Sequence, residues 1–142
     1  MKPLTKAMFV AGLAAVLCTA AAVPATAQSA GRLRVAIPFD FSMGKATLPA
    51  GDYTVQVLES GLLIFTSESG QGRQLALSTY GYSSKASGSP HLVFTRYGND
   101  VFLNQIFLSG DGEYNELPAN RKEQRLRQMA GEQTSLLIVP SR

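Results

Sequence analysis

The chain has 142 residues, of which 45% are hydrophobic and 16% charged, and its formal net charge is +3. Domains typically have about 100 to 150 residues around one core, so a single domain is expected instead of two. Lys2 and Lys6 account for most of the charge imbalance, because without them 11 basic residues face 10 acidic ones. The composition therefore argues against nucleic-acid binding, which needs a sustained basic face.

The first 27 residues are predicted to be a cleavable secretory signal. Two lysines precede an uncharged, Ala-rich run over 7–23, and Ala25-Thr26-Ala27 supplies the small residues that signal peptidase requires. We expect a signal peptide over 1–27 and a single β-rich domain over 28–142. An uncleaved membrane anchor is the alternative, but the run is short and rich in Ala, Thr and Gly. The predicted location is the periplasm or the extracellular space, with no stable transmembrane segment after processing.

The single cysteine, Cys18, lies inside the predicted signal, so the mature domain contains none. This excludes internal disulfides, a thiolate nucleophile and Cys-ligated zinc in that domain. Lipidation of Cys18 is an alternative, but a small residue usually precedes such a site and Leu17 stands here. We predict no metal and no cofactor.

Apolar residues alternate with other residues over 32–41, which is typical of a strand. Pro38 lacks an N–H group, so this strand is expected at a sheet edge or with an interruption at the proline. The sequence Leu48-Pro49-Ala50-Gly51 is typical of a type I turn. A second strand is expected directly after it.

Three strands are predicted between this turn and residue 82. Those over 52–58 and 62–67 are separated by a short glycine-containing turn and are expected to form a hairpin. The Ser-, Gly- and Lys-rich stretch 83–90 is predicted to be an exposed loop. A fourth strand is expected before that loop, over 73–82, because this stretch carries three apolar residues: Leu75, Leu77 and Tyr80.

A hairpin is predicted over 91–108, because apolar runs flank Gly98-Asn99-Asp100, a turn sequence compatible with positive φ. The segment 120–130 is the one good helix candidate, with a capping-box pattern at its start and Gly131 at its end. Its apolar side is expected to pack on the sheet, and a closing strand is expected over 136–139. The residues of these helix features are Asn120 and Glu123 for the cap, and Leu126 and Met129 for the apolar side.

The fold class that follows is all-β: a single small β-sandwich or β-barrel of about seven strands, with one short helix near the C-terminus. The pattern alone leaves sandwich and barrel open. An outer-membrane barrel ranks below both, because most predicted strands are shorter than the nine to eleven residues that spanning requires.

Several motifs resemble a family of small, uncharacterised exported proteins of environmental bacteria. The resemblance covers most of the mature chain and implies an exported β-rich domain, with no catalytic residue carried over. Met43 departs from the valine expected before the glycine. The motifs are Ile37-Pro38-Phe39-Asp40-Phe41-Ser42-Met43-Gly44 with Thr47-Leu48-Pro49-Ala50-Gly51-Asp52-Tyr53-Thr54-Val55, then Leu92 to Gly98 and Leu117-Pro118 before the helix.

Catalytic residues are hard to find in this sequence. The single histidine, His91, follows Pro90 at a strand entrance and is interpreted as a strand-end polar residue, and no Gly-x-Ser-x-Gly elbow is present. Paired carboxylates can hydrolyse glycosides, so a small hydrolase remains the alternative from another class. An EF-hand calcium loop is excluded by the incomplete ligand set after Asp111. The candidate acids are Asp100, Asp111, Glu113 and Glu116.

Two other groups of residues suggest binding. Four basic residues on the predicted helix either meet an anionic surface or are solvated, with Glu123 and Arg127 paired at i, i+4. Four aromatic residues near strand ends either line a pocket or partner surface or pack in the core. The basic residues are Arg121, Lys122, Arg125 and Arg127, and the aromatic ones are Tyr80, Tyr82, Tyr97 and Phe102.

The leading hypothesis is an exported, non-enzymatic β-domain that acts by binding or structural association in the cell envelope. No catalytic, cofactor-binding or metal-binding residue is assigned. The expected partner is an envelope protein, a polymer or a small apolar ligand, the last held inside a small barrel. A long open edge strand or a lined cavity would distinguish these possibilities.

Overall fold

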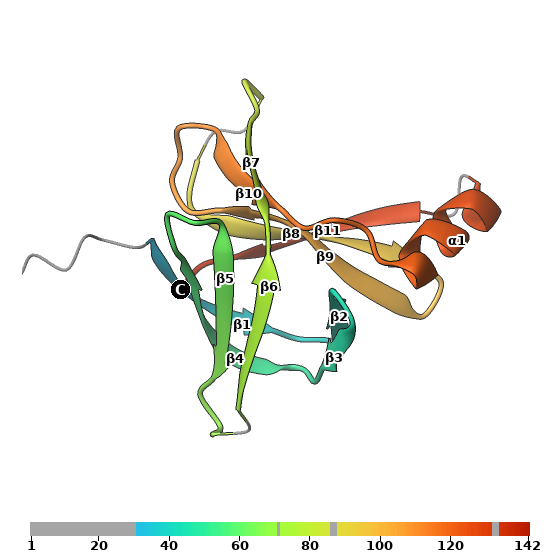
Figure 1. The fold of residues 1–142 in the computed structure, drawn as a ribbon, viewed down its shortest axis with the longest axis horizontal. Helices are drawn as coiled ribbons and strands as arrows, with labels where there is room; N and C mark the ends of the chain where they lie inside the picture. The colour runs from blue at the N-terminus through green and yellow to red at the C-terminus, as the bar shows by residue number, and fades with distance from the viewer. Residues whose placement is uncertain (1–30, 71, 86–87, 132–133) are drawn as a thin grey trace, which may run out of the picture.

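A computed structural model describes residues 31–70, 72–85, 88–131 and 134–142. These residues form eleven strands and one helix. The strands make two sheets that pack as a sandwich, not a closed barrel, which confirms the all-β class (Figure 1). The predicted signal, residues 1–27, lies outside the described residues. The elements are β1 (Arg32–Ile37), β2 (Phe41–Met43), β3 (Ala46–Leu48), β4 (Gly51–Val57), β5 (Leu62–Ser67), β6 (Arg73–Leu77), β7 (Thr79–Tyr82), β8 (His91–Tyr97), β9 (Asp100–Phe107), β10 (Glu113–Glu116), α1 (Arg121–Ala130) and β11 (Thr134–Pro140).

The first sheet has the strand order β1-β4-β5-β6, and the second has the order β11-β8-β9-β10-β7. The short hairpin β2–β3 joins the second sheet through one parallel contact, in which Ser42 lies opposite Phe102. A single bridge between Val35 and Ser141 connects β1 to the end of β11. At the other border the chain passes through Ser78 from β6 into β7 and so changes sheet.

The predicted interruption at Pro38 is confirmed. Strand β1 ends at Ile37 and β2 begins at Phe41, and the two strands belong to different sheets. Because proline cannot donate a ladder hydrogen bond, the alternating pattern over 32–41 continues in sequence while the chain leaves the first sheet. Strand β1 is at the border of its sheet, where the proline is tolerated.

Both predicted hairpins are present. Strand β4 pairs with β5 and β8 pairs with β9, in each case antiparallel. In the second hairpin Tyr97 lies opposite Asp100, so the loop has two residues, of which only Gly98 has a positive φ, at 61°. That conformation suits glycine at the first position of a tight hairpin turn. The closing strand is also confirmed, and β11 extends beyond the predicted 136–139 in both directions.

The single strand predicted over 73–82 is wrong. This stretch forms β6 in the first sheet and β7 in the second, and its apolar side chains are exposed instead of covered. Alternation along a strand is the same whichever sheet it joins, so the change of sheet at Ser78 left no signal. The exposed residues include all three on which the predicted strand was built: Leu75, Leu77 and Tyr80.

The count of about seven strands was too low because several strands are only three or four residues long. One of them, β10, contains two residues that were expected among loop carboxylates, Glu113 and Glu116. Its sequence Glu-Tyr-Asn-Glu has little apolar content, so the strand was missed. Pairing with β9 and β7 on either side forms it.

Aromatic rings fill the space between the two sheets. The ring of Phe41 lies edge-on to the rings of Tyr53 and Phe94, at centroid distances of 5.6 and 5.3 Å. The Tyr53 hydroxyl donates a hydrogen bond to the carbonyl of Pro49 at 2.6 Å, which satisfies its polar end beside the turn into β4. Burying each such ring stabilises the fold by about 1.5–3 kcal/mol. The core of the sandwich is therefore occupied by side chains.

Candidate functional site

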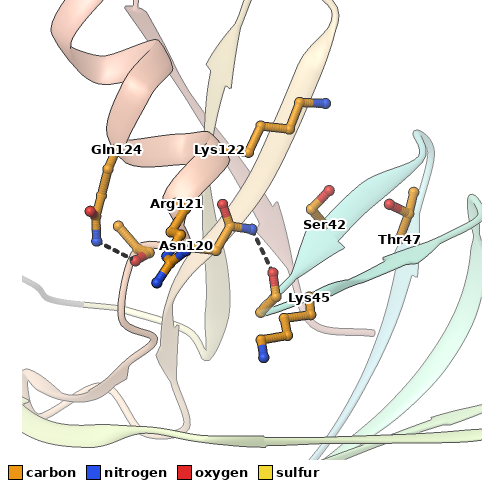
Figure 2. Close-up of a pocket in the computed structure, with 9 residues that line it drawn as sticks. Ser42, Lys45, Thr47, Asn120, Arg121, Lys122 and Gln124 are labelled. Carbon is orange, nitrogen blue, oxygen red and sulfur yellow. Dashed lines mark hydrogen bonds between the residues drawn. The ribbon is translucent and has the colours of Figure 1, made fainter.

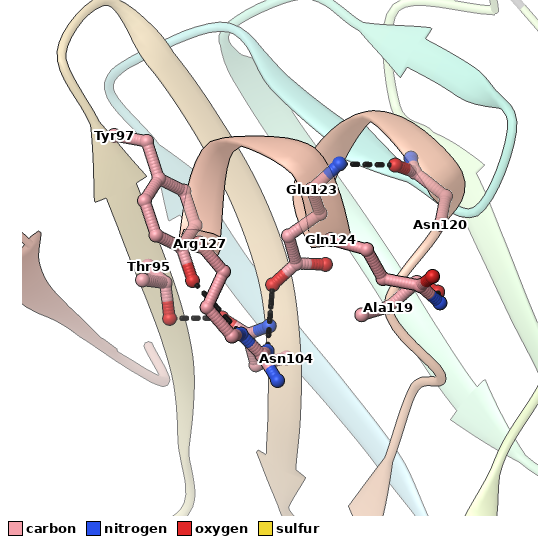
Figure 3. Close-up of polar contacts among 8 residues, drawn as sticks. All are labelled: Thr95, Tyr97, Asn104, Ala119, Asn120, Glu123, Gln124 and Arg127. Carbon is pink, nitrogen blue, oxygen red and sulfur yellow. Dashed lines mark hydrogen bonds and ion pairs between the residues drawn. The ribbon is translucent and has the colours of Figure 1, made fainter. Parts of the chain in front are cut away.

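The helix α1 lies on the outer face of the second sheet and contacts it through a polar network (Figure 3). Asn120 caps the helix as predicted, since its side chain accepts a hydrogen bond from the Glu123 N–H at 2.8 Å. The Glu123 carboxylate does not complete the capping box but turns to the sheet. There it accepts a hydrogen bond from Asn104 of β9 at 2.8 Å.

The buried side chain of α1 is therefore an acid, and the expected apolar contact is wrong for Met129. Glu123 is 3% exposed, whereas Met129 is 74% exposed and Leu126 is half-buried. The predicted i, i+4 pair is confirmed, because Arg127 Nη2 lies 3.3 Å from Glu123 Oε1. Arg127 also donates to the Tyr97 hydroxyl at 3.3 Å. These contacts raise the pKa of Arg127, and the Tyr97 bond is the largest cause.

A polar hollow of about 680 Å³ separates the start of α1 from the β2–β3 turn (Figure 2). Asn120 spans it, since its side-chain amide donates to the Gly44 carbonyl. Lys45, Arg121 and Lys122 give the lining a positive charge. Lys122 is paired with Asp100 of the β8–β9 hairpin, so Lys45 and Arg121 are the cations left to face a ligand. The N–H groups of these two side chains can donate hydrogen bonds to an acceptor in the hollow.

The candidate carboxylates do not form one group. Asp100 is paired with Lys122 at the helix, whereas Asp111 accepts hydrogen bonds from Ser109 and from the Glu113 N–H. The Ser109 bond is the main cause that lowers the pKa of Asp111. Glu113 and Glu116 lie an odd number of residues apart on β10, so their side chains leave it on opposite faces.

One hollow brings together a candidate carboxylate and an acid that the sequence did not suggest. Glu113 and Glu59 line the same surface hollow, of about 470 Å³, and both side chains are exposed. Tyr80 also lines this hollow, and its hydrogen bond to Glu113 raises the pKa of its hydroxyl to about 12. Glu59 lies in the turn between β4 and β5, and no spacing rule connects it to a residue 54 positions later.

The His91 side chain is held by packing and by a backbone hydrogen bond. Its ring stacks on Phe107 with 4.5 Å between centroids, and its Nδ1 donates to the Ser89 carbonyl at 2.8 Å. Phe107 in turn contacts the ring of Tyr114 at 5.2 Å. These rings line up across the outer face of the second sheet. Within the described residues, no group of three or more His, Cys, Asp or Glu side chains is arranged to hold a metal.

The four aromatic residues expected near strand ends divide into two pairs. Tyr97 and Phe102 are buried and pack on each other, 5.9 Å apart between ring centroids. Tyr80 and Tyr82 are exposed on β7. The alternative of core packing is therefore correct for the first pair, and a surface role is open to the second.

Large apolar side chains are exposed at two places where a sheet ends. The β6–β7 edge is the stretch that changes sheet, and the β11 edge is the outermost strand of the second sheet. The sequence does not mark the β11 edge as exposed, because both faces of 134–140 carry apolar residues and no alternation distinguishes them. The exposed residues are Leu75, Leu77, Tyr80 and Tyr82 at the β6–β7 edge, and Leu136 and Ile138 at the β11 edge.

No helix among the described residues is long and apolar enough to cross a bilayer. A scan against protein-family models finds no matching family, and searches of curated proteins and of solved structures find no match. The resemblance to small exported proteins of environmental bacteria stays a prediction.

Proposed function

We propose that this chain is an exported, non-enzymatic β-sandwich that acts by binding a protein partner in the cell envelope through the exposed edges of its sheets. The observation that carries the proposal is the set of large apolar side chains at the β6–β7 and β11 edges. Export is supported by the lysines, the Ala-rich run and the Ala25-Thr26-Ala27 site at the amino terminus. Residues 28–142 are the proposed mature form.

Because these side chains are exposed, they do not contribute the free energy of apolar burial to the isolated chain. Burying one Leu, Ile or Tyr side chain stabilises a protein by about 1.5–3 kcal/mol, and six remain exposed here. Single exposed apolar residues are ordinary, but groups of them beside an open strand are typical of interaction sites. A partner that covers either edge gains this burial.

The backbone supports the same mode of binding. An edge strand offers N–H and C=O groups to a further strand, and main-chain hydrogen bonds of this kind give affinity in strand addition. Proteins usually protect such edges with charged residues, and Arg73 is the one charged residue of β6. Strand β11 has none from Thr134 to Pro140.

Interior binding of an apolar ligand has less support, because the space between the sheets is filled by side chains. The hydrolase alternative is weaker as well, since the candidate acids are dispersed over the molecule. Glu59 and Glu113 share a hollow but are both exposed to water. General acid catalysis usually requires a carboxyl group in a less solvated site.

The proposal is tested in cells of the organism that encodes the chain. Mass spectrometry of the exported protein should give the mass of residues 28–142. A photo-cross-linking amino acid at Leu77 or Leu136 should give discrete protein adducts, and the same group at exposed Glu116 should not. An unprocessed cytoplasmic protein, or adducts equally strong at Glu116, would contradict the proposal.

A further inference from the structure

We propose that the β11 edge binds a second copy of this chain, so that two second sheets join through antiparallel β11 strands about a two-fold axis. This inference rests on the proposed function and names the partner for one of its two edges. Strand β11 is the outermost strand of the second sheet and pairs with β8 on one side (Figure 1). Among the residues that the structure describes, no strand lies along most of its other side.

The hydrogen bonds at the end of β11 show which of its backbone groups face outward. The Ser141 N–H donates to the Pro90 carbonyl, at the start of β8, and the Arg142 N–H donates to the Arg34 carbonyl on β1. Because successive N–H groups of a strand point to opposite sides, odd-numbered residues bond to β8 and even-numbered ones face away. Leu136 and Ile138 therefore combine exposed side chains with backbone groups directed at the open edge.

The sequence of β11 is complementary to itself. A two-fold axis at Leu136 places Leu136 opposite its own copy and Thr134 opposite Ile138. Each opposed pair of outward-facing residues exchanges two hydrogen bonds, so the three pairs form about six. Pro140, which has no N–H to contribute, lies outside this overlap. Leu136 and Ile138 of both copies then cover one another on the same face.

Charge distinguishes β11 from the other long edges. Antiparallel self-pairing of β1 about Leu33 sets Arg32 of one copy opposite Arg34 of the other, whereas self-pairing of β6 about Leu75 places Arg73 beside Leu77. Like charges opposite each other on paired strands are destabilising. Strand β11 has no charged residue and hence no repulsion. An uncharged edge also gives no charge pattern by which a different acidic or basic partner would be selected.

A two-fold dimer is the commonest symmetric assembly of soluble proteins, and its interface uses the same surface patch on both copies. The dimer proposed here meets that requirement with one strand. It converts two exposed edges into the centre of one continuous sheet, which removes the edge that would otherwise recruit further strands without limit.

The test uses the exported protein. Light scattering and sedimentation should give the mass of a dimer, and Leu136→Lys should convert it to a monomer at the same concentration, with at least a tenfold weaker association. Leu77→Lys, on the β6–β7 edge, should leave the dimer intact. Both residues are 69% exposed, so neither change disturbs the core, which circular dichroism checks.

A cysteine variant tests directly whether the two β11 strands pair with Leu136 opposite its own copy. The mature domain contains no cysteine, so Leu136→Cys introduces a single thiol. Residues opposite each other in a hydrogen-bonded antiparallel pair are about 5.5 Å apart at Cα, within the range that a disulfide bridges. Mild oxidation should link Leu136→Cys into a covalent dimer and leave Leu75→Cys unlinked.

The outcomes separate this inference from the proposed function. A monomer at every concentration, or a dimer lost with Leu77→Lys and kept with Leu136→Lys, overturns the inference. If the monomer is accompanied by a cross-link from Leu136 to a different protein, the β11 edge binds that protein and the proposed function stands. If neither edge gives an adduct, both proposals fail.

Discussion

Replacing Glu123 by alanine should destabilise the protein by about 2–3 kcal/mol. The hydrogen bond from Asn104 to the buried carboxylate, at 2.8 Å, contributes about 1.5–3 kcal/mol, as hydrogen bonds to charged groups do. The ion pair with Arg127 adds about 0.3–0.5 kcal/mol, because the Arg127 side chain is 60% exposed and water screens the pair. Alanine also leaves the Asn104 amide without its buried acceptor.

Urea unfolding measured by circular dichroism gives this free energy, since the chain has no tryptophan for fluorescence. For a domain of this size the loss corresponds to a melting temperature lower by about 8–12 °C. Glu116→Ala is the control, because Glu116 is an exposed acid on β10, and it should change the stability by less than about 0.5 kcal/mol. Equal stabilities of the two variants would refute a stabilising role for the buried acid.

A conservative change and a double change identify the source of the effect. Glu123→Gln keeps an oxygen that accepts from Asn104 but loses the charge, so the cost should fall to about 1 kcal/mol. In the double variant of Glu123→Ala and Asn104→Ala, neither partner is left alone. Its cost should therefore be smaller than the sum of the single changes, by about 0.5–3 kcal/mol.

Three further measurements test other contacts. Gly81→Ala should cost about 1–3 kcal/mol in urea unfolding, because a Cβ at this position overlaps the Tyr114 ring. The pKa of Tyr80, about 12, should fall toward 10 in Glu113→Gln when the titration is followed by NMR. In the unchanged protein, the contribution of the Tyr80–Glu113 hydrogen bond to stability is full below pH 10 and is lost as the pH rises to about 12. Asn120→Ala should cost about 1 kcal/mol through loss of the helix cap, whereas Asn120→Asp, which retains the capping oxygen, should cost less.

The elements that were predicted correctly have local causes. The hairpin over 91–108 follows from apolar runs around a glycine that adopts positive φ, and α1 follows from a side chain that caps the N–H three residues later. Both signals act over a few residues and need no knowledge of the sheet. The break at Pro38 belongs to the same class, since the missing N–H acts wherever the strand is placed.

The elements that were missed have distant causes. Strand β10 forms because β9 and β7 both pair with it, and its own four residues carry no strand pattern. The hollow that joins Glu59 to Glu113 depends on how the two sheets meet at Ser78. A single sequence does not reveal such contacts, because nothing in the alternation of a strand identifies the sheet that it joins.

Two kinds of exception to the rule of apolar inside and polar outside remain, and they differ in their explanation. Glu123 is a buried acid, but Asn104 and Arg127 satisfy it within the chain, so its burial is explained by the fold. Leu136 and Ile138 are exposed apolar residues, and nothing among the described residues covers them. Sequences that specify a fold violate the rule mainly where function requires it. The exposed apolar edges of the sheets, β11 among them, and not the buried acid, are therefore where a partner of this protein should be sought.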